Sequence, residues 1–328
     1  MIYTHGVFNY AGQKMYPDWP DFAAHTTPRE QTYLRNKEIG GDSGRKGLIF
    51  EGRYAAFRLV ELAAALLNGD LEAARVHLKI QVRSFVDDFA IIFDDQIEWY
   101  EIKSGKVYWG KVPDAEVETG VVERKERTVA DNFRSQASVD QSIGYPSTLT
   151  LVVADGELRD KLRNERRHHD LPGVEVHWIP DSHSPSEIWE IEPEFEEWLR
   201  ALSPLTESEE DFEVVYDAFQ GAIAKLKPGV ALNLLELGKL AAKRYHGVLS
   251  IGRKGRLNPE TWGILELFKA DVQFAVSGTT LHYQWKGDHG IVPAEIGTEA
   301  GRRFEAAVKA MPNYDVQTLI ELLWRFKW

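Results

Sequence analysis

The chain has 328 residues, of which 43 % are hydrophobic, and this is enough for one large globular domain or two ordinary ones. It has no cysteine, which excludes disulfides and thiolate metal sites and fits a cytoplasmic protein. No apolar run reaches the ~18 residues of a spanning helix, and the N-terminus lacks the features of a signal peptide, so we expect no membrane association. The formal net charge of −12 argues against nucleic-acid binding over the whole surface, although basic segments can still bind it locally.

We divide the chain into three parts: an N-terminal extension over residues 1–45, an α/β domain over residues 46–204 and a mainly helical accessory domain over residues 205–328. The second boundary follows from the proline and acidic residues of Ser203–Asp211. In chain order, the hydrophobic patterns of the first two parts predict helix Pro28–Lys37, helix Ile49–Asn68, strands Leu78–Phe85, Phe89–Phe93 and Ile97–Lys103, helix Val122–Ile143, strand Thr148–Val153, helix Leu158–His168, strand Val174–Ile179 and helix Glu187–Leu202.

The accessory part is predicted to hold helices on both sides of one β-hairpin, which turns at Ser277-Gly278. Helices followed by a hairpin are compatible with a winged-helix DNA-reading domain, in which the hairpin is the wing. The predicted elements are helices Phe212–Leu226 and Ala231–Arg244, hairpin Phe274–Trp285, and helices Glu299–Ala310 and Val316–Phe326.

One stretch, VDDFAIIFDDQIEWYEIKSGK over Val86–Lys106, combines six carboxylates with residues that are typical of buried strands. Side chains alternate along a strand, so Glu101 and Lys103 must project to the same side. Pairing of the two strands through the turn at Asp94-Asp95-Gln96 brings Asp87 or Asp88 opposite Glu101. We expect strand alternation to let only one of these two aspartates face Glu101, and the residues alone leave the choice open.

Two carboxylates and a lysine at one end of a hairpin suit Mg²⁺, which takes a few oxygen ligands and keeps several waters. Such a metal lowers the pKa of a bound water and neutralises charge on a scissile phosphate, and a nearby lysine orients or deprotonates that water. The alternative is a solvated surface ion pair worth ~0–1 kcal/mol, but the strands are too apolar for an exposed edge. The cations and aromatic residue that follow are candidates for phosphate contacts: Lys106, Trp109, Arg124 and Arg127.

The pattern Asp88 … Glu101-Ile102-Lys103 resembles the signature of the PD-(D/E)xK nuclease superfamily, most of all the double-stranded-DNA endonuclease domain of bacterial antiphage effectors. The resemblance covers Gly47–Ile179, and no proline precedes the aspartate as it does in many members. Glu51 matches an extra acidic ligand on the preceding helix, and Gln141 with Tyr145 matches a Gln-x-x-x-Tyr element of the RecB-like branch. The resemblance implies a restriction-endonuclease-like fold, with a mixed central sheet flanked by helices.

The resemblance also implies an activity, a Mg²⁺-dependent endodeoxyribonuclease in antiphage defence or restriction. By analogy with the family, Glu51, Asp88 and Glu101 would hold Mg²⁺ or Mn²⁺, Lys103 would serve the attacking water, and Gln141 would help to place the DNA strand. The chain has no phosphate loop, so any ATP-driven step would belong to a partner ATPase or sensor protein. Cutting both strands usually needs two sites, so a homodimer is expected.

Two alternatives remain open at this point. The first is an RNA substrate for the same site. The second is a catalytically inactive nuclease-fold subunit that binds nucleic acid or protein, which the acidic charge and the aromatic C-terminal segment LLWRFKW favour.

Overall fold

The computed structural model describes residues 19–40, 45–72, 75–110, 127–171, 173–182, 184–206, 208–245, 249–251, 257–292 and 294–326. The described residues fall into two compact units. The first unit draws on the ranges Met1–Ala56, Ala74–His183 and Ile223–Leu234, and the second on Phe57–Ala73, Ser184–Ala222 and Leu235–Trp328. Among the described residues, no helix combines the length and the apolar character that crossing a membrane requires.

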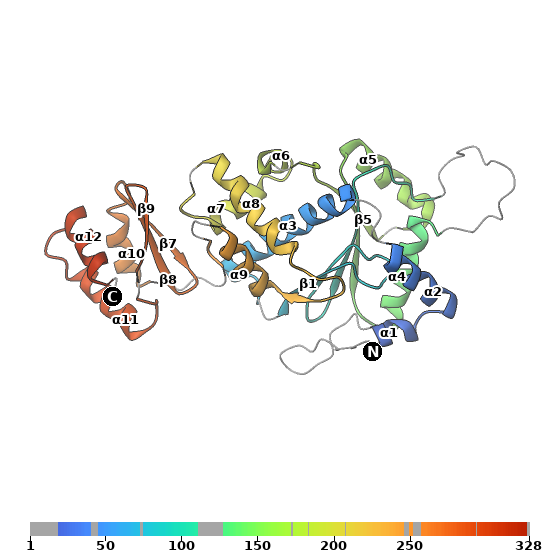
Figure 1. Ribbon diagram of the computed structural model, residues 1–328, viewed down its shortest axis with the longest axis horizontal. Coiled ribbons are helices and arrows are strands. Elements are labelled where there is room, and N and C mark those ends of the chain that lie inside the picture. The colour runs from blue at the N-terminus through green and yellow to red at the C-terminus, as the bar shows by residue number, and fades with distance from the viewer. Residues whose placement is uncertain are drawn as a thin grey trace. The chain divides into compact units, whose positions relative to one another are not determined.

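The first unit is built on a six-stranded mixed sheet with the strand order β5-β4-β3-β2-β1-β6, of which Figure 1 labels β5 and β1. Strand β3 pairs in parallel with β4, and β4 with β5, whereas the other neighbours are antiparallel. This arrangement confirms the prediction of an α/β structure with a mixed central sheet. The strands are β1 His77–Ile80, β2 Phe89–Ile92, β3 Ile97–Lys103, β4 Ser147–Val153, β5 Val174–Trp178 and β6 Leu232–Asn233.

Two strands differ from the sequence prediction. Strand β1 ends at Ile80, earlier than predicted, because Gln81 adopts a left-handed conformation with φ 47° and the chain bends there. Strand β6 was predicted to be part of a helix. Its two residues pair with His77 and Leu78 at the sheet edge, and two residues are too few to show an alternating pattern.

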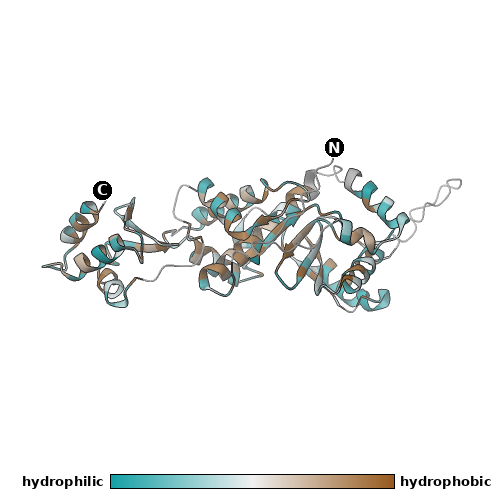
Figure 2. Cartoon of the chain, turned by 90° about the horizontal axis from the view of Figure 1, so that it is seen from below, coloured by the Kyte–Doolittle hydropathy of each residue, from teal (hydrophilic) through white to brown (hydrophobic). Residues whose placement is uncertain are grey.

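Helices cover both faces of this sheet. One face packs against α1 Trp19–Ala24, α2 Pro28–Gly40, α4 Val129–Ile143 and α5 Gly156–Glu165 in a single hydrophobic cluster. The other face meets α3 Arg45–Asn68, where the ring of Tyr54 lies 5.4 Å from that of Tyr100. Because both faces are covered, the strands are rich in hydrophobic residues, which are brown in Figure 2, and all four residues of β2 are buried.

Helix α4 begins at a capping box and is shorter than predicted. The Thr128 side chain accepts a hydrogen bond from the Asp131 N–H, and the Asp131 side chain accepts one from the Thr128 N–H. The helix ends at Gly144, whose φ of 76° is the left-handed conformation that glycine adopts most easily. The earlier part of the predicted helix, residues 122–126, lies outside the described residues.

The second unit contains two helix pairs and an aromatic cluster. The predicted helix Glu187–Leu202 is two helices, α6 Pro185–Trp189 and α7 Glu194–Leu202, because Pro193 interrupts the helical hydrogen bonds. Phe195 packs against Phe57 and Tyr216 with 5.3 Å between ring centroids in each case. The other two helices are α8 Glu209–Ile223 and α9 Leu234–Arg244.

The C-terminal part of the second unit holds a three-stranded antiparallel sheet where the sequence predicted one hairpin. The predicted hairpin is present as β7 Val272–Ser277 and β8 Thr280–Trp285, with Gly278 at φ 57° in its turn. Strand β9 Asp288–Val292 extends it, and a separate hydrophobic core joins the sheet to helices α10 Pro259–Glu266, α11 Glu299–Lys309 and α12 Val316–Arg325.

We expect the capping box to contribute measurably to stability. Thr128→Ala should lower the free energy of unfolding by about 0.5–2 kcal/mol in chemical denaturation, whereas Ser138→Ala on the exposed face of α4 should change it by less than about 0.5 kcal/mol. The hydrogen bond from the Thr128 N–H lowers the pKa of Asp131 to about 2. Its stabilising contribution is therefore present above the unfolded-state pKa of roughly 4, and it is lost as the pH falls towards 2. Asp131→Asn should lack that part of the pH dependence.

A candidate metal centre at the end of the β2–β3 hairpin

The centre is formed where β2 begins and β3 ends. The pairing of Phe89 with Tyr100 makes Asp88 and Glu101 the next residues outward on the two strands. The Asp88 Oδ2 accepts hydrogen bonds from the Ile102 N–H at 2.7 Å and from the Lys103 Nζ at 3.0 Å. The Lys103 Nζ also lies 2.9 Å from the Glu101 Oε1, so the structure brings together the three residues of the predicted Asp … Glu-x-Lys pattern.

Asp87 also belongs to this centre. One carboxylate oxygen from each of Asp87, Asp88 and Glu101 lies within 4.8 Å of the others, a spacing that a single cation can bridge. The prediction that only one of the two aspartates faces Glu101 is therefore wrong. Strand alternation does not apply to them, because both lie in the bend that precedes the first residue of β2, Phe89.

A second cation, Lys37 of α2, completes the cluster, and no sequence pattern had pointed to this lysine. Its Nζ lies 2.5 Å from the Asp87 Oδ1 and 3.7 Å from the Glu101 Oε2. The same group donates a hydrogen bond of 2.8 Å to the Phe85 carbonyl. Lys37 lies far along the chain from the hairpin, in a helix with no recognisable motif, so only the folded structure reveals this contact.

The two lysines decide the ionisation of Glu101, whose side chain is 5 % exposed. Burial opposes ionisation, but the attraction of Lys103 and Lys37 outweighs it and lowers the pKa of Glu101 to about 2. The Oε2 of this carboxylate accepts no hydrogen bond from the described residues. A buried carboxylate that stays ionised and keeps an oxygen without a donor is the kind of ligand a divalent cation uses.

The other carboxyl groups are harder to ionise. Burial raises the pKa of Asp87 to about 8, with Lys37 opposing and Glu101 and Asp88 adding to the rise. Burial likewise raises the pKa of Asp88, against the opposing attraction of Lys103. Burial and repulsion from Asp88 raise the pKa of Glu51 to about 7. Four carboxyl groups therefore share the site with two ammonium groups. A bound divalent cation would favour the ionised form of the carboxyl groups that burial keeps protonated.

Glu51 approaches the centre from α3 but lies outside the group of three converging oxygens. Helix α3 starts at Arg45, so Glu51 is well past the first turn and is not explained by the helix dipole. Its repulsion by Asp88 and Glu101 indicates that it belongs to the same electrostatic environment. Glu51 therefore remains a candidate outer ligand.

The structure does not bring Gln141 to the centre. Gln141 is exposed in the last turn of α4, and Tyr145 just beyond it donates a hydrogen bond to the Phe93 carbonyl in the β2–β3 turn. The centre lies at the opposite end of this hairpin, at Asp88 and Glu101. Gln141 is thus on the wrong end of the sheet to contact a metal or substrate held there.

A different glutamine of α4, Gln136, binds the backbone of the segment that leads into the two aspartates. Its buried Oε1 accepts a hydrogen bond of 3.1 Å from the Phe85 N–H, just before the two aspartates. Its Nε2 donates to the Asp140 Oδ1 at 2.9 Å, and the Asp140 Oδ2 accepts from the Trp99 Nε1 at 3.1 Å. Gln136 follows the buried Phe133 at helical spacing, a signal that could have identified it as the inward-facing glutamine.

Two of the residues proposed for phosphate contacts have structural roles instead. Trp109 is buried, and its Nε1 donates a hydrogen bond to the Leu162 carbonyl. The Arg127 guanidinium lies over the ring of Phe85 and 3.5 Å from the Glu30 carboxylate. Lys106 is exposed beside the centre, and Arg124 lies outside the described residues.

The comparisons with known proteins gave no relatives. No family model matches the chain. No curated protein and no solved structure matches it either. The interpretation of the centre therefore rests on its own chemistry.

The two glutamines of α4 provide a matched test of this description. Gln136→Leu leaves the buried Phe85 N–H and one Asp140 oxygen without their partner, so we expect the free energy of unfolding to fall by about 1–3 kcal/mol. Gln141→Leu, on the exposed face of the same helix, should change it by less than about 0.5 kcal/mol. Denaturant titration of both variants measures this. A larger loss for Gln141→Leu would contradict the assigned positions.

Proposed function

We propose that the protein is a metal-dependent endonuclease that hydrolyses phosphodiester bonds in DNA. The observation that carries this proposal is the convergence of the Asp87, Asp88 and Glu101 oxygens within 4.8 Å, beside the ammonium of Lys103. A cluster in which carboxyl groups outnumber ammonium groups suits Mg²⁺ or Mn²⁺, which bind oxygen ligands. A metal site by itself does not indicate a nuclease. The ammonium of Lys103, held beside Asp88 and Glu101, adds a second positive group that suits a phosphate.

Asp88 and Glu101 would hold the metal, with Asp87 as a third ligand and Glu51 in the outer shell. When bound, the metal lowers the pKa of a coordinated water and neutralises charge on the scissile phosphate. Burial opposes protonation of Lys103, but Glu101 and Asp88 outweigh it and raise the pKa of this lysine well above its usual value. Lys103 therefore stays an ammonium group and donates hydrogen bonds to phosphate oxygens, whose negative charge grows in the transition state. In this proposal, Lys103 binds the phosphate and does not act as the base that deprotonates the attacking water.

The finer assignments belong to the same proposal. Membership of the PD-(D/E)xK superfamily, with a restriction-endonuclease-like fold, is supported by the position of Asp88 just before β2 and of Glu101-x-Lys103 on the paired strand β3 of a mixed sheet. A winged-helix-like DNA-reading role for the C-terminal part is supported by its three-stranded sheet and helices. A partner ATPase or sensor protein, a homodimer, a cytoplasmic location and a role in antiphage defence or restriction complete the proposal.

One observation favours a second candidate, a catalytically inactive nuclease-fold subunit. Lys37 already lies 2.5 Å from Asp87 and 3.7 Å from Glu101, so two lysines partly neutralise the carboxylates without a metal. In that case the cluster would be a structural ion network, and the protein would act as a binding or assembly module. Metal uptake separates the two candidates.

The first test is DNA cleavage. We expect the full-length protein to cut duplex DNA in the presence of Mg²⁺, and we expect EDTA to stop the cleavage. The Lys103→Ala variant should cleave about 10²–10³-fold more slowly, because the charge of the transition state loses a preorganised hydrogen-bond donor. Asp95→Asn, an exposed acid in the turn of the same hairpin, should cleave like the wild type. Equal cleavage by wild type and Lys103→Ala would falsify the assignment of Lys103. A duplex RNA substrate, run in parallel, tests the alternative nucleic acid.

The second test is metal uptake by calorimetry. The wild type should bind Mn²⁺ in a manner that Glu101→Gln abolishes. Lys37→Met removes an ammonium that competes with the metal for Asp87 and Glu101, so it should bind Mn²⁺ more tightly than the wild type. Lys225→Met, at an exposed lysine elsewhere, should leave the affinity unchanged. If the wild type takes up no Mn²⁺ and Lys37→Met only destabilises the fold, the inactive-subunit candidate is correct.

A further inference from the structure

A pocket with a volume of about 600 Å³ opens immediately beyond the candidate metal centre. One wall is the segment Ser104–Tyr108, which follows directly after Lys103, and the other is the end of β4 with the first turns of α5. Strands β3 and β4 are parallel neighbours, and Lys103 pairs with Val153, so both walls start from the same edge of the sheet. The carboxyl edge of parallel strands is a common location for ligand sites.

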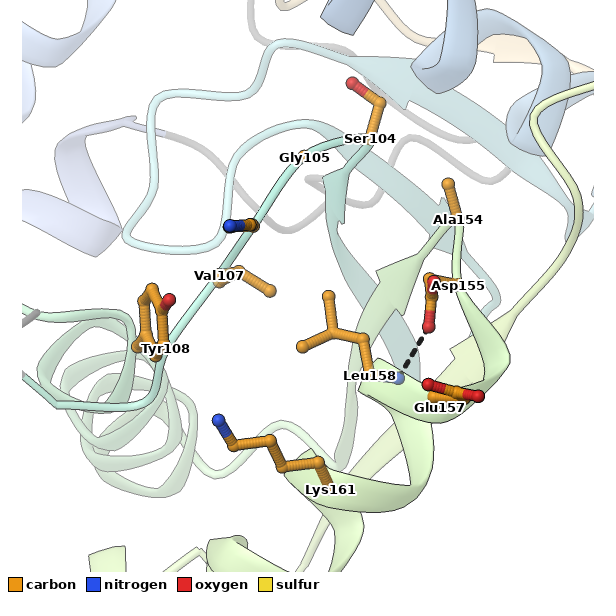
Figure 3. Close-up of a pocket in the computed structure, with 10 residues that line it drawn as sticks. Ser104, Gly105, Val107, Tyr108, Ala154, Asp155, Glu157, Leu158 and Lys161 are labelled. Carbon is orange, nitrogen blue, oxygen red and sulfur yellow. Dashed lines mark hydrogen bonds between the residues drawn. The ribbon is translucent and has the colours of Figure 1, made fainter.

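The chemistry of the pocket differs between its two sides, as Figure 3 shows. The side chains of Val107 and Leu158 face each other across the middle and give it an apolar floor. Tyr108 and Lys161 lie together on one side, with the Lys161 Nζ 5.4 Å from the centre of the Tyr108 ring. Glu157 lies on the other side, near Asp155, whose carboxylate is engaged by the Leu158 N–H at 2.7 Å.

This combination fits a nucleoside phosphate. An aromatic face and an apolar floor suit the face of a base, because bases stack on aromatic side chains irrespective of their sequence. An ammonium group beside that face suits a phosphate. The Lys161 amino group lies over the Tyr108 ring and 3.9 Å from Glu165, and its side chain is 54 % exposed. It can therefore turn from the ring toward a phosphate when a base stacks on Tyr108. Lys106, exposed on the opposite wall, supplies a second cation to the same pocket.

We propose that this pocket holds the nucleotide next to the scissile phosphate in the strand that is cut. Its base lies against Tyr108, Val107 and Leu158, and its phosphate meets Lys161 and Lys106. The acidic side at Glu157 repels phosphate and therefore faces the base or the sugar. The inference rests on the proposed nuclease function for the identity of the strand, but the chemistry of the pocket does not depend on the metal.

The assignment of the nucleotide follows from the place of the pocket along the chain, next to the metal centre. Lys103 contributes to the metal centre, and the next residue, Ser104, already lines the pocket. We therefore assign the pocket to a nucleotide that neighbours the phosphate held at the centre. Tyr108, Lys161 and Lys106 are accordingly assigned as substrate-positioning residues, separate from the metal ligands.

The test measures binding in EDTA, so that no cleavage occurs, with the full-length protein. The probes are deoxyadenosine 5′-monophosphate and the single-stranded hexamer d(A)6, followed by ligand-observed NMR and equilibrium titration. We expect the wild type to bind both probes and the hexamer more tightly. Tyr108→Ala and Lys161→Glu should each weaken hexamer binding about tenfold or more, and Lys225→Glu, at an exposed lysine elsewhere, should weaken it by less than about twofold.

The pocket variants are expected to fold normally, so a change in binding can be attributed to the substituted side chain. Both substituted positions are at least partly exposed, so thermal unfolding should show intact folding. Hexamer binding that is unaffected by Tyr108→Ala and Lys161→Glu, or absent in the wild type, overturns the proposal. Equal affinity for the monophosphate and the hexamer overturns the strand assignment and gives the pocket to a free nucleotide.

The same variants separate this inference from the proposed function. If wild type cleaves DNA and the pocket variants cleave and bind normally, the pocket assignment fails while the nuclease stands. If no preparation cleaves but the hexamer binds through Tyr108 and Lys161, the nuclease assignment fails while the pocket stands. Under both proposals, the pocket variants raise the KM for cleavage far more than Lys103→Ala does.

Discussion

The structure depends on how one hairpin end accommodates negative charge inside an otherwise apolar sheet. Asp88, just before β2, lies beside Glu101 of β3, and Glu101 is almost fully buried. Burying such charges without partners costs several kcal/mol, so the fold must bring cations to them. It does so with Lys103 on the same strand and with Lys37 on α2. The remaining excess of carboxyl groups leaves a place for a divalent cation and so connects the fold to the proposed chemistry.

The sequence was sufficient for the parts of this centre that depend on local rules. Alternation along β3 places Glu101 and Lys103 on one side, and a short turn aligns the strand that follows Asp88 with β3. The order of the hydrophobic segments predicted most of the strands and helices of this sheet, whereas its mixed character was expected from the resemblance to the nuclease superfamily. Local rules failed where the chain leaves regular structure: Asp87 and Asp88 lie in a bend, and both turn toward Glu101.

Contacts that depend on tertiary packing were beyond the sequence. Lys37 reaches the centre from a helix whose sequence carries no signal for it, and β6 is too short to show a pattern. The two glutamines of α4 show the same limit. A family-like motif pointed to Gln141, which is exposed, whereas Gln136 is the buried glutamine that binds the segment before the aspartates. Spacing relative to Phe133 would have chosen correctly. A resemblance in a motif thus needs to be checked against the face of the helix on which its residues lie.

The hydrogen-bond chain from Trp99 through Asp140 and Gln136 to the Phe85 amide has a wider consequence. Lys37 also donates a hydrogen bond to the Phe85 carbonyl, so the peptide groups on both sides of Phe85 are anchored, one by Gln136 of α4 and the other by Lys37 of α2. The positions of the Asp87 and Asp88 carboxylates therefore depend in part on the fully buried side chains of Trp99, Asp140 and Gln136. Substitution of the buried indole or of its carboxylate partner would therefore shift the aspartates of the proposed metal centre, although neither residue belongs to that centre.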